Sequence, residues 1–517
     1  MWLLLALAAP CMAHGAGVEV SGLPRRVWGG RAIRPVVRVM DVGPDQTLRL
    51  VWAVLLDGDV LQGEIKGVRG AAEREIEIVL PQVRVRVSTT FAVHLFEGQG
   101  ALAEESRRLD VFPSVLLAGL ARAYEDRPVG LVAVGREPEA VTQPIPIRWR
   151  VLSSGAAVQA FQGEAFFLVA DRQLRRRSDL TAALMERVEG GATVICLGDV
   201  VAPLPLEGAG ENVQPGAFRA ARLLAPEHPV FDTLEPGDLA DWAADGVVAR
   251  QALAWPESGN CTVLADAGPG PEPLALLVEV RRGAGRVLYC APAVLEKLPQ
   301  EPVAEVLLGN MVRWAFSPVE PLGKATVRLA GGSGLREVVA ALAPGTGGEG
   351  GALVGDGSLL AGRGKELLAG LLRGGGTAVL FHLSEEDASA LNGLLRARWE
   401  RDVHASPPAL RLCPARPDAL RGFSLRAAHP LLGGVRPEDV HALADAGDWE
   451  DVHAIAAAAD EEHFTDLMGG GLVAKLERDG VRLVFWQTPL SEEGGGAQER
   501  VLAAMFGNLG IGLTNQH

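Results

Sequence analysis

The sequence has little tyrosine and little cysteine, and each shortage excludes a kind of protein. Only 2 of the 517 residues are tyrosine, against 10 tryptophans, so an aromatic surface that stacks on sugars would have to use tryptophan or phenylalanine. Five cysteines are too few for a disulfide-rich scaffold. We expect buried free thiols, with one bridge as the alternative, at the four cysteines beyond the N-terminus: Cys196, Cys261, Cys290 and Cys413.

Basic residues are in deficit and long apolar runs are missing. Lys plus Arg number 49 against 64 Asp plus Glu, which gives a net charge of −15. An acidic chain repels phosphate backbones, so nucleic acid is not a predicted partner. No later stretch reaches the ~18 uninterrupted apolar residues of a membrane span, so none is predicted. With 48% apolar and 22% charged residues, the chain is typical of a globular protein and long enough for about three domains.

The first residues, "MWLLLALAAPCMAHGAG", are typical of a secretory signal. An apolar run from Trp2 to Ala9 is followed by small residues, with a cleavage point after Ala13, although no Lys or Arg precedes the run. The alternatives are a buried first strand or a misplaced start codon. We predict that residues 1–15 are a signal peptide and that the protein is secreted or lies in the periplasm or cell envelope.

Residues 16–113 show the alternation of β-strands. "TLRLVWAVLL" places every second residue on one face, Asp57-Gly58 follows as a hairpin turn, and "EREIEIVLP" and "VRVRVS" alternate in the same way. Charged residues on the other face indicate a sheet that is covered on one side. About seven such runs predict an all-β, immunoglobulin-like sandwich.

From residue 126 onward, strands and helices alternate. "AFFLVADRQL" and "ATVICLG" are apolar throughout, as in a parallel sheet that is covered on both faces. Between them, "RSDLTAALMERVEGG" predicts a helix that Asp179 caps and that Gly190-Gly191 ends. Pro302 opens a further helix. This part of the chain is therefore predicted to be α/β.

A motif in this part occurs twice. "HPVFDTLEPGDL" begins at His228 and "HPLLGGVRPEDV" at His429, with His, Pro, a later Pro and Asp at identical offsets. A matching asparagine in the last helix follows each copy at nearly equal distance, 310 − 228 = 82 and 508 − 429 = 79 residues. We predict one α/β domain in two copies, residues 126–320 and 322–517, with structural hydrogen bonds at Asn310 and Asn508.

The repeated unit resembles the class I glutamine amidotransferase-like superfamily. The residues behind this resemblance are the helix–Gly-Gly–strand junction at 181–198, the His-Pro turn, and "GRVLYC" with the later "EPVAEVLLGN". More narrowly, it is similar to the non-catalytic trimerisation domain of β-galactosidases. The resemblance covers most of residues 126–316 and, more weakly, 323–513. It implies a flavodoxin-like, three-layer parallel sheet in each copy, and the region in front resembles accessory domains of secreted glycosidases.

Active members of that superfamily use a cysteine on a Gly-x-Cys-x-Gly turn with a later His and Glu. Such a turn exposes the thiolate, the imidazole takes its proton, and the carboxylate orients the imidazole. In "VICLGD" the weak candidate is Cys196, but Val194 replaces the first glycine, and "LYCAPAVLE" lacks the His. In the second copy Phe381 takes the cysteine position, and "VFWQTPLSEE" also lacks a His. We therefore predict a buried core thiol and no intact triad in either copy.

The His-Pro motif has a structural and a ligand-binding interpretation. Structurally, the His bonds a loop backbone and the following Asp caps a short helix. Alternatively, paired His and Asp bind a ligand. Trp242 and Trp449 are either packed or exposed sugar platforms. The candidate ligand-binding residues are Asp171, His228, Asp238, Trp242, His429 and Asp439.

Neither a metal nor a cofactor is predicted. His441, His453 and His463 lie among acidic residues in "DVHALADAGDWEDVHAIAAAADEEHFTDL", but without a recognisable ligand spacing. We interpret this stretch as a solvated amphipathic helix.

The leading functional prediction is a non-catalytic scaffold or a carbohydrate-associated binding protein. Its expected partner is a polysaccharide or an envelope protein. One alternative is a glycan hydrolase, which needs two carboxylates ~5–10 Å apart, and Asp171, Asp199 and Asp448 are its candidates. The other alternative is a structural subunit that forms homo-oligomers through the α/β pair.

Overall fold

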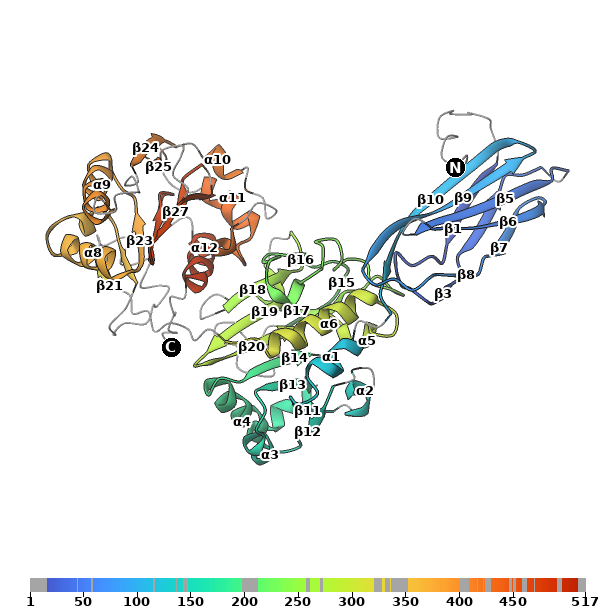
Figure 1. The fold of residues 1–517 in the computed structure, drawn as a ribbon, viewed down its shortest axis with the longest axis horizontal. Coiled ribbons are helices and arrows are strands. Elements are labelled where there is room, and N and C mark those ends of the chain that lie inside the picture. Colours follow the sequence, from blue (N-terminus) through green and yellow to red (C-terminus); the bar gives the residue numbers. More distant parts are fainter. Residues whose placement is uncertain are drawn as a thin grey trace. The chain divides into compact units, whose positions relative to one another are not determined.

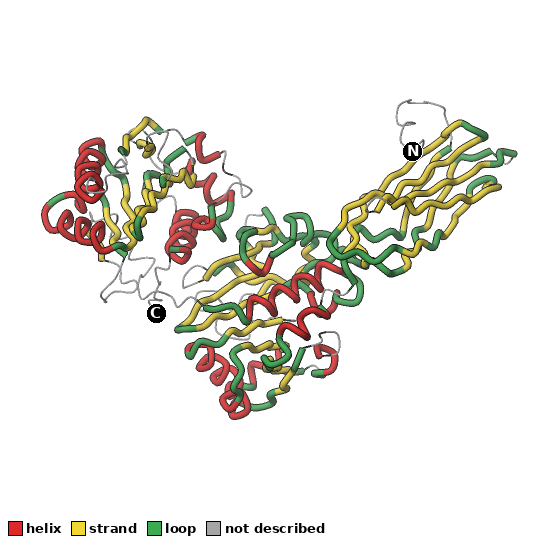
Figure 2. The backbone as a smooth tube through the Cα atoms, viewed as in Figure 1, coloured by secondary structure: helices red, strands yellow, loops and turns green. Residues whose placement is uncertain are grey.

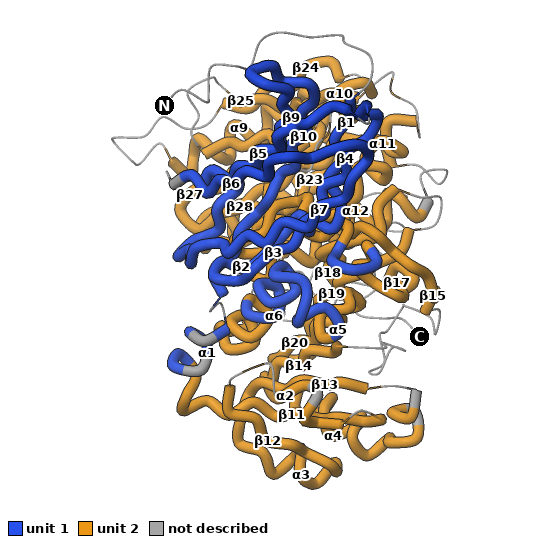
Figure 3. The backbone as a smooth tube through the Cα atoms, turned by 90° about the vertical axis from the view of Figure 1, so that its right-hand side faces the viewer, with its two compact units in different colours: residues 1–123, 242–245, 296–309 blue, residues 124–241, 246–295, 310–517 orange. Residues whose placement is uncertain are grey.

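The structure is a computed structural model with two compact units, coloured separately in Figure 3. Unit 1 comprises residues 1–123, 242–245 and 296–309, and unit 2 comprises the rest. The predicted signal peptide and the Asp57-Gly58 turn lie outside the described residues, and the predicted domain boundaries stay predictions. The described residues are 16–43, 45–56, 59–114, 117–135, 137–142, 145, 147–170, 172–197, 213–256, 261–269, 273–319, 328–330, 335, 352–399, 409–415, 417–421, 423, 429–445, 449, 452–457, 463–468, 470–490 and 495–509.

The described residues of unit 1 up to Phe112 are all-β. Their sheets have the strand orders β1-β4-β7, β2-β10-β9-β5-β6 and β3-β8, and only the β2–β10 pairing is parallel. Figure 1 labels the strands, which are β1 Gly17–Ser21, β2 Arg26–Trp28, β3 Ala32–Ile33, β4 Val36–Met40, β5 Leu48–Leu56, β6 Asp59–Val68, β7 Ala72–Glu75, β8 Ile78–Val79, β9 Val87–Glu97 and β10 Gly100–Phe112.

Alternation of burial predicts the core of this region well and one strand wrongly. Leu48, Leu50 and Val54 of β5 are at most 1% exposed and share one apolar cluster with residues of both larger sheets. The alternation in "VRVRVS" predicts a strand throughout, but the chain bends at Arg84–Val85, Val85 is 70% exposed, and β9 begins only at Val87. A period of two needs a partner strand in register, and these residues pair with none among the described strands.

Unit 1 also contains buried charged contacts with the segments at 242–245 and 296–309. The Arg26 Nε donates to Glu301 Oε1 at 2.9 Å, and both side chains are at most 2% exposed. Trp28 Nε1 donates to Glu305 Oε2 at 3.0 Å. Because burying a charge without a partner is costly, these contacts fix how β2 packs against that segment. The helices that begin in unit 1 or cross its limits are α1 Ala118–Ala123, α5 Val294–Lys297 and α6 Pro302–Ala315.

Unit 2 begins with a mixed sheet of order β12-β11-β13-β14-β20-β19-β17-β15. The strands from β12 to β20 in this order are parallel, and β19 adds antiparallel to β20. The prediction of a parallel sheet covered on both faces is confirmed here, because every residue of β13 and β14 is buried. The strands are β11 Val129–Val134, β12 Trp149–Val151, β13 Ala165–Ala170, β14 Thr193–Leu197, β15 Val213–Phe218, β16 Arg222–Leu223, β17 Ala249–Ala254, β18 Cys261–Asp266, β19 Leu274–Arg282 and β20 Gly285–Cys290.

The helix predicted near residue 180 exists, but its start differs from the prediction. Arg177 is the N-cap, and Asp179 lies in the first turn of α4, where its carboxylate accepts from Gly155 N at 3.0 Å and from Arg177 Nε at 3.0 Å. Asp179 therefore links α3 to α4 instead of capping α4. The predicted stop is confirmed at Gly190, with Gly191 at φ +110°. The remaining helices of this region are α2 Glu139–Thr142, α3 Gly155–Ala160 and α4 Ser178–Glu189.

A second sheet, of order β21-β22-β23-β28-β27-β26, follows in unit 2. Its strands from β21 to β28 in this order are parallel, and β27 adds antiparallel to β28, which is the pairing pattern of β14, β20 and β19. Figure 2 shows helices beside these strands. The elements are β21 Arg328–Ala330, β22 Leu353–Gly355, α8 Gly362–Gly374, β23 Gly376–Phe381, α9 Glu385–Trp399, β24 Leu410–Pro414, α10 Asp418–Arg421, α11 Pro437–Asp445, β25 His453–Ala457, β26 Phe464–Met468, β27 Val473–Arg478, β28 Val481–Trp486 and α12 Gly495–Asn508.

The stretch from 439 to 467 is not the single amphipathic helix that we predicted. It holds the end of α11, then β25, which pairs antiparallel with β24, and then β26, which pairs with β27. Ile455 is fully buried against the second sheet. Pairing with distant strands therefore overrides the helix preference of the alanine-rich sequence.

Within unit 2, the region of the second sheet contacts the region of the first. Gly434 N donates to Leu224 O at 3.1 Å, and Arg222 of β16 forms a two-nitrogen contact with Glu438 of α11. Asp266 of β18, 1% exposed, lies 3.4 Å from the buried Arg436 Nε. These contacts join the second His-Pro turn to strands of the first sheet.

Candidate functional site

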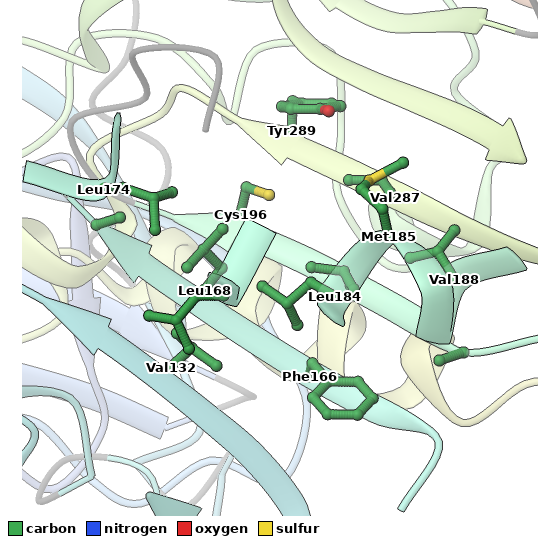
Figure 4. Packing of buried hydrophobic residues seen from close by; sticks show 14 of the residues in the cluster. Val132, Phe166, Leu168, Leu174, Leu184, Met185, Val188, Cys196, Val287 and Tyr289 are labelled. Atoms are coloured by element: carbon green, nitrogen blue, oxygen red, sulfur yellow. The ribbon is translucent and has the colours of Figure 1, made fainter. Parts of the chain in front are cut away.

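Cys196 is a core residue, the last but one in β14. Its side chain is fully buried, and Figure 4 shows its sulfur among apolar side chains that include Leu168, Leu174 and Tyr289. Burial raises the pKa of the Cys196 thiol far above its usual range, and the neighbouring Cys290 raises it further. Val194 lies in the same strand, so the backbone up to Leu197 is a regular strand and not a sharp turn.

The position in the second sheet that matches Cys196 is Leu380, not Phe381 as predicted. Cys196 pairs with Tyr289, the fifth residue of β20, and Leu380 pairs with Phe485, the fifth residue of β28. Leu380 packs with residues of α8, as Cys196 packs with residues of α4, whereas Phe381 faces α12. A shift of one residue reverses the face of a sheet, and apolar runs without alternation hide that shift in the sequence.

The two His-Pro turns have the same internal hydrogen bonds. His228 Nδ1 accepts from Val230 N at 3.3 Å, and His429 Nδ1 accepts from Leu431 N at 3.1 Å. Asn310 Nδ2 donates to the carbonyl oxygens of Val230, at 3.2 Å, and Asp232, at 2.7 Å.

Asn508 Nδ2 repeats this arrangement, with distances of 3.1 Å to Leu431 O and 2.8 Å to Gly433 O. The predicted bonds of the histidines to the loop backbone and of both asparagines are therefore confirmed. Each asparagine ties the last helix to a 3₁₀ turn, Pro229–Phe231 or Pro430–Leu432.

The outward nitrogen of each histidine has a different partner. His228 Nε2 lies 3.0 Å from Glu279 Oε2, whose side chain is 6% exposed. Burial alone would raise the pKa of Glu279, but the contact with His228 and two nearby arginines lower it below its usual value. His429 Nε2 instead lies 3.3 Å from Lys475 Nζ, which occupies the strand position of Glu279. The turn is repeated, but its electrostatic surroundings are not.

The two aspartates of the motif do not cap a following helix, which corrects that prediction. Asp238 Oδ2 accepts from Glu235 N, three residues before it, at 2.8 Å, and no helix follows in residues 239–256. Asp439 lies inside the first turn of α11, and its buried carboxylate binds Arg500 of α12 at 2.7 Å. Both carboxylates have intramolecular partners.

The other sequence candidates are packed or undescribed. Trp242 is 1% exposed, so neither face of its ring is free to stack on a sugar, and Trp449 packs against a core cluster. Asp171, Asp199 and Asp448 lie outside the described residues. The four cysteines beyond the N-terminus are free thiols.

The described residues contain neither a membrane-spanning helix nor a candidate metal site. No helix in that part of the chain is long and apolar enough to cross a membrane. Over the same residues, no group of three or more His, Cys, Asp or Glu side chains could hold a metal ion.

A polar group that the sequence did not reveal lies at the carboxyl ends of β23 and β28. It consists of His382, Gln487 and Thr488, which we call the His382 cluster. His382 directly follows β23 at φ +46°, and its Nε2 lies 2.5 Å from Thr488 O. Gln487 Oε1 accepts from Leu383 N at 3.1 Å. Ligands of parallel α/β sheets bind at this edge, so the cluster is the candidate functional site.

Two polar atoms of the cluster lack a hydrogen-bond partner. Gln487 is 3% exposed and Thr488 is fully buried, yet Gln487 Nε2 and Thr488 Oγ1 have none in the structure. An unpaired buried polar group costs about 1–3 kcal/mol, so such groups in proteins usually meet a ligand or an ordered water. The sequence carries no signal for this cluster. The backbone of His382 is unusual, with a positive φ at a non-glycine residue, but this is seen only in the structure.

Comparisons with known proteins do not identify this chain. No family model and no curated protein matches the sequence. Among solved structures, an exo-β-1,4-mannosidase from an Opitutaceae bacterium is 14% identical over 38% of this chain and 36% of that chain, with a TM-score of 0.21. A superoxide reductase from Ignicoccus hospitalis is 12% identical over 19% of this chain and 82% of its own, with a TM-score of 0.16. These TM-scores are too low to support a conclusion about fold or function.

Proposed function

We propose that this protein is a secreted, non-catalytic scaffold that binds carbohydrate. In this proposal an immunoglobulin-like sandwich precedes two flavodoxin-like domains, which are degenerate copies of an amidotransferase-like ancestor. The position of Cys196 carries the non-catalytic part of the proposal: its thiol is fully buried within β14, with a strongly raised pKa. A nucleophilic cysteine needs an exposed thiolate beside a base.

Two further observations support the duplicated architecture. The order of strands around β14 and β20 recurs around β23 and β28. The asparagine that holds each His-Pro turn recurs with it. Both copies keep these structural hydrogen bonds, whereas the position of Cys196 is occupied by Leu380 in the second copy. This is what we expect of a domain with a structural and not a catalytic role.

The test combines an activity assay with a binding panel on the full chain. We expect no turnover of glutamine or p-nitrophenyl acetate, and retention on at least one insoluble polysaccharide or arrayed glycan. The variant Cys290→Ser is the matched control for Cys196→Ser, because Cys290 is an equally buried thiol on the adjacent strand β20. Turnover that Cys196→Ser abolishes and Cys290→Ser retains would contradict the non-catalytic assignment, and a panel without any bound glycan would contradict the carbohydrate assignment.

A further inference from the structure

Three segments that follow parallel strands of the second sheet meet at its carboxyl edge. They are the turn after β22, which begins at Asp356, the turn between β23 and α9, and the residues after β28. Gly357 packs so closely on α9 that a Cβ there would lie 2.4 Å from Asp387 Oδ2. Leu383 N and Gln487 Oε1 join the other two segments. The His382 cluster therefore lies where these segments converge.

The hydrogen bonds of the cluster determine what each free group can do. A carbonyl oxygen only accepts, so His382 Nε2 must donate its proton to Thr488 O. Loss of part of the ring's hydration lowers the pKa of His382, while the contact with the Thr488 backbone and the charge of Asp356 act in the opposite direction. In a neutral ring that donates through Nε2, Nδ1 is an acceptor, and the His382 side chain as a whole is exposed to solvent. The side-chain amide of Gln487 accepts from Leu383 N through its Oε1. Its Nε2 is therefore an unpaired donor beside the same turn.

The first α/β region lacks this polarity at the matching positions. Leu197 pairs with Cys290 as Phe381 pairs with Trp486, so the residues that follow correspond in the two regions. The first region has Ala291 and Pro292 where the second has Gln487 and Thr488. Packing alone does not require the two polar side chains after β28, because a small and an apolar residue occupy the same positions after β20.

The charges around the cluster restrict the ligand. The first turn of α9 carries Glu385, Glu386 and Asp387, which oppose the usual attraction of anions to a helix N-terminus. The unpaired Gln487 N–H group opposes a cation. A hydroxyl group satisfies both requirements, since it can accept from the amide and donate to the imidazole.

We propose that the His382 cluster binds hydroxyl groups of a neutral sugar. One hydroxyl accepts from Gln487 Nε2 and donates to His382 Nδ1, and Thr488 Oγ1 bonds the same or a neighbouring hydroxyl. This rests on the proposed carbohydrate-binding function and adds its site, in the second α/β region, and its chemistry. No covalent step is involved.

The decisive variant is Thr488→Val, which has nearly the same shape and removes the unpaired hydroxyl. Its matched control is Thr193→Val, since Thr193 is also a buried threonine of a parallel sheet, but its Oγ1 accepts from Arg286 Nε at 3.2 Å. We expect Thr488→Val to leave the unfolding temperature of the free protein unchanged or higher, and Thr193→Val to lower it. An unpaired hydroxyl contributes nothing to the free fold, whereas a paired one does.

Binding is measured by calorimetry with glucose, galactose and mannose, using the full chain. We expect at least one sugar to bind with a Kd on the order of 1 mM. Binding should be roughly tenfold weaker in Thr488→Val and in Gln487→Leu. The control Thr193→Val should bind as the wild type does. Sugar binding that the two cluster variants leave unchanged would overturn the site while leaving the proposed function standing. Three other results would also overturn the proposed site. They are equal destabilisation by Thr488→Val and Thr193→Val, binding of acetate or phosphate alone, and the absence of any bound sugar.

Discussion

Replacing Asn310 by alanine should loosen the first His-Pro turn and leave the second intact. Asn310 is 1% exposed and donates to two carbonyl oxygens of the turn, one of them on the fully buried Val230. Losing both bonds and leaving the acceptors unpaired costs about 2.5–4.5 kcal/mol. Alanine regains about 0.5 kcal/mol through its helix propensity in α6. The expected net loss is therefore about 2–4 kcal/mol.

Hydrogen exchange measured by mass spectrometry tests this locally. The amides of Phe231, Asp232 and Leu234 are bonded within the turn, so they report its opening. A loss of about 2–4 kcal/mol corresponds to roughly 30- to 700-fold faster exchange at these amides.

Asn508→Ala is the reciprocal control, because the same bonds hold the turn at Leu431–Gly433. Each variant should accelerate exchange in its own turn and leave the other turn within about threefold of the wild type. If Asn310→Ala accelerates its own turn by less than threefold, or loosens both turns alike, the asparagine is not what holds the turn.

Three further predictions concern charged contacts. Glu279→Gln should lower the free energy of unfolding by about 1–2 kcal/mol at pH 7. Because the folded pKa of this carboxyl is lowered, the wild type should lose that advantage as pH falls below about 5 toward the folded pKa. Urea titrations of the two proteins that give parallel pH profiles would refute this. Arg222→Ala and Glu438→Ala should show a coupling energy of about 1 kcal/mol in a double-mutant cycle. If the two losses of unfolding free energy simply add, the contact contributes nothing to stability. Glu301→Gln should destabilise unit 1 by about 3–5 kcal/mol, because it removes the carboxylate that faces the buried charge of Arg26. A thermal unfolding midpoint equal to that of the wild type would contradict the pairing.

Runs of apolar residues and the glycines at helix ends account for most of the secondary structure that could be predicted. Fully buried strands such as β13 and the helix stop at Gly190-Gly191 follow from local patterns. The recurrence of His228 and Asn310 as His429 and Asn508 led to a correct expectation of structural hydrogen bonds, because repeated spacing survives only where the partners meet.

Local patterns failed where a distant partner decides the outcome. The strand β25 forms because β24 pairs with it, although the alanine-rich sequence favours a helix. Asp439 binds Arg500, a residue 61 positions away, instead of capping a helix as its place in the motif suggested. Leu380 matches Cys196 only once the strand register is known.

The candidate site shows this division most sharply. His382, Gln487 and Thr488 are ordinary residues in the sequence, and His382 lies more than 100 positions before the other two, which are adjacent. By itself, the sequence determined which segments are apolar enough to be buried and where the repeated turns begin, since those depend on neighbouring residues. Only the tertiary structure decided that three carboxyl ends meet and that two buried polar atoms there are left unpaired, because pairing and burial depend on residues that the chain brings together from far apart.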